Sequence, residues 1–201
     1  MVGLLLAGCA TQKTGYQQAD RTSKRIADFG DQVLEMKVAV DEVTRTLSGL
    51  VEAPTADPRK AHRLFTRAVD RLEAADAKAN QRADRMRTEG REFFSGWEQE
   101  LQSIQNDELR ATAQERRAHL DGEFRGISRV IVELRDVFRP WVKDVNDLRT
   151  VLGRDLTVSG IDRARGVISG VQDDSAEVQR ALDNLISQVE LVQAKLTPGR
   201  Q

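Results

Sequence analysis

The amino-acid sequence predicts an all-α protein, built as an elongated antiparallel four-helix bundle with coiled-coil packing. Aromatic residues make up only 4% of the 201 residues, whereas 31% are charged and four are proline. This composition is typical of long helices with a large solvated surface. Apolar residues recur in steps of three and four along four long stretches, a pattern called the seam here, which indicates helices packed lengthwise against one another. Short segments with proline, glycine or capping residues separate the stretches.

The first predicted helix covers residues 20–52. Its seam follows the heptad spacing without a gap, at Ile26, Phe29, Val33, Met36, Val40, Val43, Leu47 and Leu50. Residues 10–19 before it are polar and carry no apolar period, so we expect a polar tether there. Two prolines and a capping Asp57 in the segment that follows the helix predict a short loop.

The second predicted helix covers residues 58–105. Its seam consists of Ala61, Phe65, Ala68, Leu72, Ala75, Ala79, Met86, Phe93, Trp97, Leu101 and Ile104. Arg82 and Gly90 fall on seam positions, and so does Arg116 in the next helix. An arginine on the seam is expected either to fix the register of the bundle or to mark a place where the bundle opens.

The third predicted helix covers residues 107–152, with Asn106 and Asp107 as capping residues. Its seam is Leu109, Ala113, Leu120, Phe124, Ile127, Ile131, Leu134, Phe138, Trp141, Val145, Leu148 and Leu152. Pro140 lies inside this helix. Because the apolar pattern continues without a change of phase, we expect a local bend there and not a helix end.

The fourth predicted helix covers residues 160–196, after a glycine-bounded turn with Ser159 as a possible cap. Its seam is Ile161, Ala164, Ile168, Val171, Ser175, Val178, Leu182, Leu185, Val189, Val192 and Leu196. Gly166 and Gly170 are expected to permit close approach of a neighbouring helix. Residues 20–197 therefore form one helical domain, a rod about 70 Å long at about 1.5 Å per residue.

The N-terminal residues 1–9 resemble the end of a bacterial lipoprotein signal peptide. Gly3–Ala10 reads GLLLAGCA, and its Leu-Ala-Gly-Cys ending resembles a lipobox, which implies that Cys9 carries lipid. The segment lacks a basic start and a full apolar stretch, so we expect translation to begin upstream. It is too short to span a membrane, which takes about 20 apolar residues. Ala10 stands where Asp favours inner-membrane retention, so we expect the periplasmic face of the outer membrane.

A longer resemblance covers most of the chain and is densest between Phe94 and Ile161. It rests on Trp97, Glu98, Glu100, Leu101, Ile104, Asn106, Leu109, Arg110, Leu120, Pro140, Asp147, Leu152, Leu156 and Ile161. In these residues the chain resembles the bacterial coiled-coil lipoproteins grouped as domain of unknown function 2959. It departs from them at residues 153–157, GRDLT, where they carry a Lys-His-Asn-Leu-Asn run. The resemblance implies a helical envelope protein and brings no known activity.

The sequence offers no catalytic, cofactor or metal constellation. His62 and His119 are isolated on different helices and have no partner in an HxxE or HxxxH pattern, so we expect surface or boundary histidines. The single cysteine excludes an intramolecular disulfide and a cysteine-rich metal site. Lys and Arg number 31 against 32 Asp and Glu, so no net field draws nucleic acid to the chain. We therefore expect a protein that is not an enzyme.

Three functional hypotheses remain. The leading one is a membrane-tethered, non-enzymatic scaffold or spacer of the envelope that contacts an unidentified envelope protein. The second is a carrier or sensor that binds a hydrophobic ligand between helices near Trp97 or Trp141. The third is a cytosolic coiled-coil adaptor, if the lipobox is accidental. In each case the seams can close within one chain or by formation of a homo-oligomer.

Overall fold

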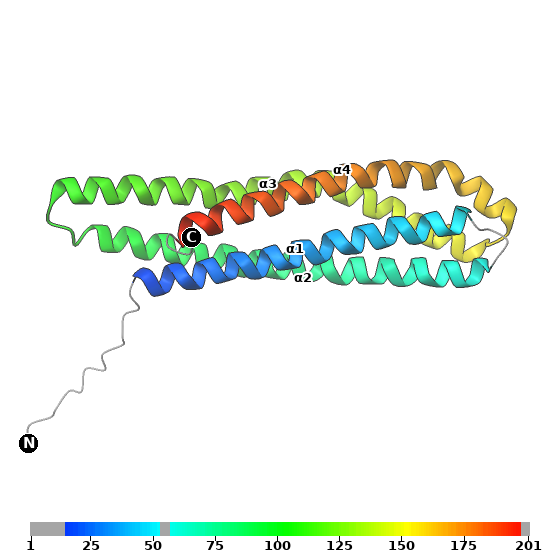
Figure 1. Ribbon diagram of the computed structural model, residues 1–201, viewed down its shortest axis with the longest axis horizontal. Coiled ribbons are helices and arrows are strands. Elements are labelled where there is room, and N and C mark those ends of the chain that lie inside the picture. The colour runs from blue at the N-terminus through cyan, green and yellow to red at the C-terminus, as the bar shows by residue number, and fades with distance from the viewer. Residues whose placement is uncertain (1–14, 53–56, 198–201) are drawn as a thin grey trace, which may run out of the picture.

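The computed structural model describes residues 15–52 and 57–197, which form four long helices. They are α1 (Gly15–Glu52), α2 (Pro58–Leu101), α3 (Asp107–Arg154) and α4 (Val158–Leu196). Figure 1 shows the helices side by side as a rod, with consecutive helices antiparallel. α1 packs against α2 and α4, and α3 packs against α2 and α4, so the helices form a four-sided ring. The predicted all-α four-helix bundle is confirmed.

The two ends of the rod differ. The end of α1, the start of α2 and the α3–α4 connection lie together at one end, called here the closed end (Figure 1). α1 begins and α4 finishes toward the other end, where the α2–α3 hairpin runs on alone, and this is called the open end. The longest helix, α3, has 48 residues and is about 72 Å long at about 1.5 Å per residue.

The apolar seams form one continuous core. Every seam residue of α1 is at most 3% exposed, and every seam residue of α4 is at most 8% exposed. The seams of α2 and α3 are buried in the same cluster from Phe65 to Phe93 and from Leu120 to Leu152. Burial of one large apolar side chain contributes about 1.5–3 kcal/mol. The shared core is therefore the main source of stability.

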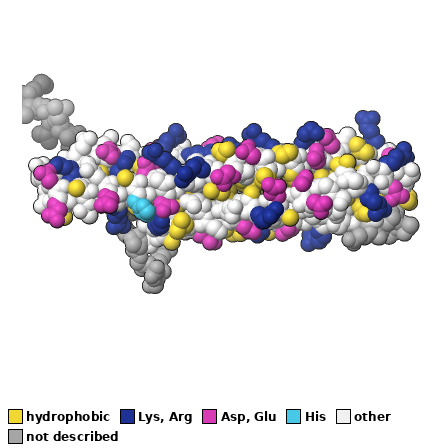
Figure 2. Space-filling model, turned by 90° about the horizontal axis from the view of Figure 1, so that it is seen from above, with side chains coloured by type: hydrophobic (Ala, Val, Ile, Leu, Met, Phe, Trp, Pro, Cys, Tyr) yellow, Lys and Arg dark blue, Asp and Glu magenta, His cyan; other side chains and the backbone are white. Residues whose placement is uncertain are grey.

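The outer surface carries mixed charge. In Figure 2 the basic and acidic side chains are interspersed over the visible face, with small apolar patches between them. None of the described helices is long and apolar enough to cross a membrane.

Several helices begin or end at residues other than those predicted, because local hydrogen bonds and contacts determine the helix ends. α1 begins at Gly15, so residues 15–19 of the predicted tether are helical, and residues 10–14 lie outside the described part. Ala19 packs against the core, and this contact favours helix over tether. α2 ends at Leu101 and not at residue 105, because the amides of Gln102, Ser103 and Ile104 turn back to carbonyls three residues earlier.

The remaining helix ends follow from side-chain caps. Asp57 and Asn106 cap α2 and α3 as expected, accepting from the amides of Lys60 and Leu109 at 2.9 and 3.0 Å. α4 begins two residues early, at Val158, because Thr157 is the N-cap in place of Ser159 and its hydroxyl accepts from the Gly160 amide at 3.1 Å. α3 runs on to Arg154 and is unbroken at Pro140.

The glycines contradict one expectation. A Cβ added at Gly166 or Gly170 would meet nothing within 4 Å, so neither glycine permits a close approach among the described residues. Both glycines lie away from the core, because α4 packs against its neighbours through its seam residues. Gly90, which falls on the seam of α2, makes a close interhelical contact. A Cβ added there would lie 2.2 Å from Cζ of Phe124.

These contacts predict opposite effects for the same substitution. Gly166→Ala and Gly170→Ala are each expected to raise the free energy of unfolding by up to about 1 kcal/mol, because alanine favours the helix and meets no neighbour. Gly90→Ala is expected to lower it by about 1–3 kcal/mol, because Phe124 must move. Urea denaturation followed by circular dichroism measures both effects. A stabilised Gly90→Ala variant would show that the Phe124 ring moves aside freely.

Candidate functional site

Cys9, the predicted lipidation site, lies outside the described residues. The first described residue, Gly15, follows six positions later in the sequence. Lipidation of Cys9 therefore stays a prediction.

The two histidines lie far apart in different surroundings. His62 is half-buried on α2 near the closed end, with Nε2 3.4 Å from the carbonyl oxygen of Arg149. His119 is exposed on α3 toward the open end, with Nε2 3.7 Å from Oε1 of Glu123. Within residues 15–52 and 57–197, no group of three or more His, Cys, Asp or Glu residues is arranged to hold a metal ion.

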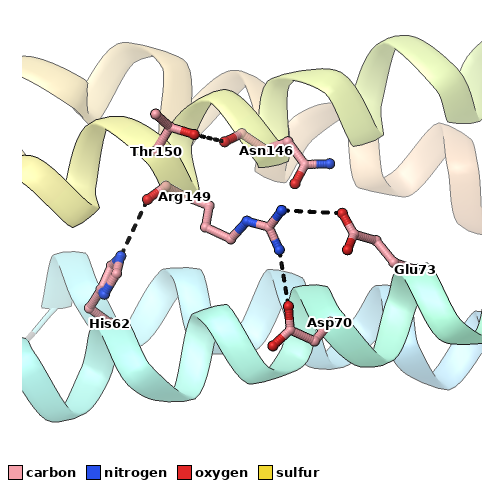
Figure 3. A network of polar contacts seen from close by, with 6 residues as sticks. All are labelled: His62, Asp70, Glu73, Asn146, Arg149 and Thr150. Atoms are coloured by element: carbon pink, nitrogen blue, oxygen red, sulfur yellow. Dashed lines mark hydrogen bonds and ion pairs between the residues drawn. The ribbon is translucent and has the colours of Figure 1, made fainter.

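An interhelical network centred on Arg149 includes His62 (Figure 3). The guanidinium of Arg149 on α3 reaches Asp70 and Glu73 on α2, at 3.1 and 3.3 Å. Both carboxylates are largely exposed, so each pair contributes about 0–1 kcal/mol. The network links α2 to α3 through two ion pairs and one contact from His62.

Trp141 belongs to the core. It is 2% exposed, and its indole Nε1 donates a 2.9 Å hydrogen bond to the carbonyl oxygen of Val171 on α4. Its ring centroid lies 6.0 Å from that of Phe138. With its polar atom satisfied and its ring enclosed, Trp141 leaves no room for a ligand beside it.

Trp97 has a different environment, because it is half-buried and lines a pocket at the open end. The pocket has a volume of about 340 Å³. We call it the open-end pocket, and all four helices contribute to its lining of Gly15, Gln18, Ala19, Phe93, Trp97, Glu100, Ala113, Arg116, Leu120 and Leu196. Of the two tryptophans, only Trp97 lies where a hydrophobic ligand has access.

The open-end pocket exists because the helices have unequal lengths. α2 and α3 continue past the ends of α1 and α4 (Figure 1), so their apolar strips lose their cover. Small residues face the gap from α1 and α3, namely Gly15, Ala19 and Ala113. Farther out, Leu109 is 63% exposed, which makes its predicted place in the packed seam wrong.

The two seam arginines behave differently. Arg82 turns to the edge of the core, where its guanidinium lies 3.5 Å from the carboxylate of Asp28 on α1, and Ala83 fills the core beside it at 2% exposure. It therefore links α1 to α2. Arg116 is exposed on the rim of the open-end pocket. It marks the place where the bundle opens.

A second concave surface lies between α2 and α3, and the sequence patterns did not indicate it. This groove has a volume of about 980 Å³ and includes Phe94 and Phe124. Four arginines line it, Arg87, Arg91, Arg117 and Arg125. Three of them pair with acidic residues that also line the groove, at 2.5–3.0 Å. The only sequence signal was Gly90, which admits the Phe124 ring.

A polar cluster interrupts the middle of the α2–α3 packing. Arg135 donates to Oδ1 of Asn80 at 2.9 Å, and Asn80 donates to Oδ1 of Asp76 at 2.9 Å. Burial raises the pKa of Asp76, and the hydrogen bond from Asn80 and the charges of Arg135 and Arg139 offset this only in part. The cluster borders a cavity of about 40 Å³, which is large enough for an ordered water molecule.

The sequence model of one family, described as "Protein of unknown function (DUF2959)", matches residues 9–196. The chain belongs to the DUF2959 family. The match begins at Cys9 and ends at the last residue of α4, so the region shared by this DUF2959 protein and its family includes all four helices and the open-end pocket. No curated protein and no solved structure matches the chain. The resemblance to this family is confirmed, and it brings no activity with it.

The Asp76 cluster of this DUF2959 protein predicts a pH-dependent stability. Because the folded pKa of Asp76 is raised, the charged form is less favourable in the folded chain than in the unfolded one. Its contribution to stability is fully present below the unfolded value of 3.8 and is lost as the pH rises through the folded value. Asp76→Asn, which stays neutral, is expected to be more stable than the wild type at pH 7, by roughly 1 kcal/mol or less.

Denaturation curves measured across the acid range check this prediction. The advantage of Asp76→Asn is expected to shrink as the pH falls toward 3.8. Asp31→Asn, at an exposed position of α1, is the matched control. An advantage that grows with falling pH would contradict the assigned direction of the shift.

Proposed function

We propose that this DUF2959 protein is an envelope lipoprotein, anchored through lipid on Cys9, whose rod-shaped bundle spaces or scaffolds envelope components without enzymatic activity. One observation carries the proposal: the helix that follows the lipobox begins at the open end of a long rod. An anchor at Cys9 would thus hold one end of the rod at the membrane and leave the other end free.

The dimensions support this orientation. Gly15 follows Cys9 by six positions, and six steps of about 3.3–3.6 Å span at most about 22 Å. The open end would therefore stay near the membrane surface, while the closed end reaches about 70 Å away. Several acyl chains on one cysteine would give stable anchoring, since each buried methylene contributes about 0.8 kcal/mol. The family match that begins at Cys9 is consistent with a shared anchor.

The closed end has side chains suited to a partner. Leu64, Val151 and Val158 are 47%, 54% and 50% exposed, and each lies within about two turns of a helix end there. Exposed apolar side chains at the free end favour contact with an unidentified envelope protein over a solvated tip. Ala10 supports the periplasmic face of the outer membrane as the location.

The anchor is tested by labelling cells with a fatty-acid analogue. The wild-type chain, expressed from its own gene, is expected to take up label and to fractionate with membranes, whereas Cys9→Ala is expected to lose both. Ala10→Asp is the companion variant and should keep the label while moving to the inner membrane. Absence of label in the wild type and in both variants would contradict the lipoprotein proposal and favour a cytosolic coiled-coil adaptor.

The scaffold role is tested by photo-crosslinking in intact cells. A photoreactive residue at Val158 is expected to crosslink to an envelope protein, because this position lies at the free end. The same residue at Val132, in the middle of α3, is a control of similar exposure, 54% against 50%, and should crosslink much less. Equal crosslinking at the two positions would contradict a partner site at the closed end.

A further inference from the structure

The open-end pocket has apolar walls and a volume that admits part of one linear apolar chain. Its volume of about 340 Å³ lies near the lower limit of small-molecule pockets, about 300–1,000 Å³. Phe93, Trp97, Leu120 and Leu196 supply apolar walls from three helices. Because Leu196 and Leu120 are themselves well buried, the inner part of the pocket is continuous with the bundle core.

The rim of this pocket has two charged residues without an ion-pair partner among the residues that the structure describes. Arg116 on α3 and Glu100 on α2 both line it, and neither forms an ion pair within 4.0 Å with a described residue. Their neighbours do pair: Arg117 lies 3.0 Å from Glu98, and Arg110 contacts Asp107. An occupant with a single negative charge would meet Glu100 as well as Arg116. An occupant with both signs of charge would satisfy the two residues.

We propose that the open-end pocket binds a single-chain zwitterionic lipid of the lysophosphatidylethanolamine class. The acyl chain lies against Trp97, the phosphate at Arg116 and the ammonium group at Glu100. This assignment is independent of an anchor on Cys9, because the ligand is a separate molecule and every residue that holds it belongs to the described helices.

The chain-binding step is tested with 1-oleoyl lysophosphatidylethanolamine, below its micelle concentration, on the full-length unlipidated Cys9→Ala protein. Calorimetry is expected to show saturable binding to the parent protein. Ala113→Leu, which fills the pocket, should weaken binding about tenfold, equal to about 1.4 kcal/mol. Ala118→Leu is the matched control, since it places the same side chain on the exposed face of α3. Equal binding by the two variants would overturn the proposal.

Fluorescence identifies the wall that the chain contacts. A lysophosphatidylethanolamine with a brominated acyl chain is expected to quench Trp97 and to leave Trp141 unquenched, because Trp141 is enclosed in the core. Trp97→Phe should therefore remove the quenching. Quenching that persists in this variant would place the chain elsewhere and overturn the assignment.

The head-group step is tested by comparison with 1-oleoyl lysophosphatidylglycerol, which has the same chain and phosphate but no ammonium group. The zwitterionic lipid is expected to bind more tightly, and Glu100→Gln should remove this preference. Arg116→Gln should weaken both lipids, and Arg45→Gln, at an exposed position of α1, should weaken neither. Equal affinity for the two lipids in the parent protein would overturn the zwitterionic assignment.

Two other occupants are distinguished by the same measurements. If the chain's own anchor fills the pocket, the lipidated wild type will show no quenching while Cys9→Ala does. If a second copy fills it, sedimentation will show a dimer that the lipid dissociates. Either result would overturn the proposal, and the expected result is quenching of a monomer in both forms.

Discussion

The structure depends on one constraint: four amphipathic helices must share a single apolar core, because none of them can bury its seam alone. Ile26, Leu72, Ile127 and Leu182, one from each helix, are each 0% exposed in this shared core. Each buried side chain of this size contributes about 1.5–3 kcal/mol. An exposed ion pair contributes about 0–1 kcal/mol. The apolar seams therefore determine which helix faces pack together, and the charged residues occupy the remaining faces on the outer surface.

Apolar seams leave the register open, because a helix displaced by one heptad still presents an apolar face. Polar contacts between helices resolve this ambiguity. Gln179 on α4 donates to Asp41 on α1 at 2.8 Å, and Arg71 on α2 reaches Glu42 on α1 at 2.5 Å. A shift of one heptad would break both contacts at once. The partly buried hydrogen bond from Arg135 to Asn80 links α2 and α3 in the same way.

The sequence predicted the faces that pack but not how far the packing extends. The seams of α1 and α4 were predicted without error, because heptad spacing states directly which face is apolar. Leu109 was placed on a seam for the same reason. It is nevertheless exposed, because α1 and α4 stop short of this part of the α2–α3 hairpin. Gly166 was predicted to permit a close helix contact, but Gly90 is the glycine that does so. The sequence does not distinguish them, because a helical glycine that faces a ring and one that faces solvent can have the same spacing. Both errors concern a neighbour on another helix, which a local pattern does not contain.

The unequal helix lengths also explain why the candidate site lies at one end. α1 and α4 have 38 and 39 residues, whereas α2 and α3 have 44 and 48. The difference of ten residues between α1 and α3 corresponds to about 15 Å of helix. Both connections at the closed end are short, and buried Leu50, Leu152 and Ile161 fix the levels of the helices there. The surplus length must therefore project at the open end, where Leu109 of the apolar seam is exposed and where Arg116 and Glu100 form no ion pair with a described residue. A ligand that is apolar along its length and charged at its head would meet both deficits at the open-end pocket.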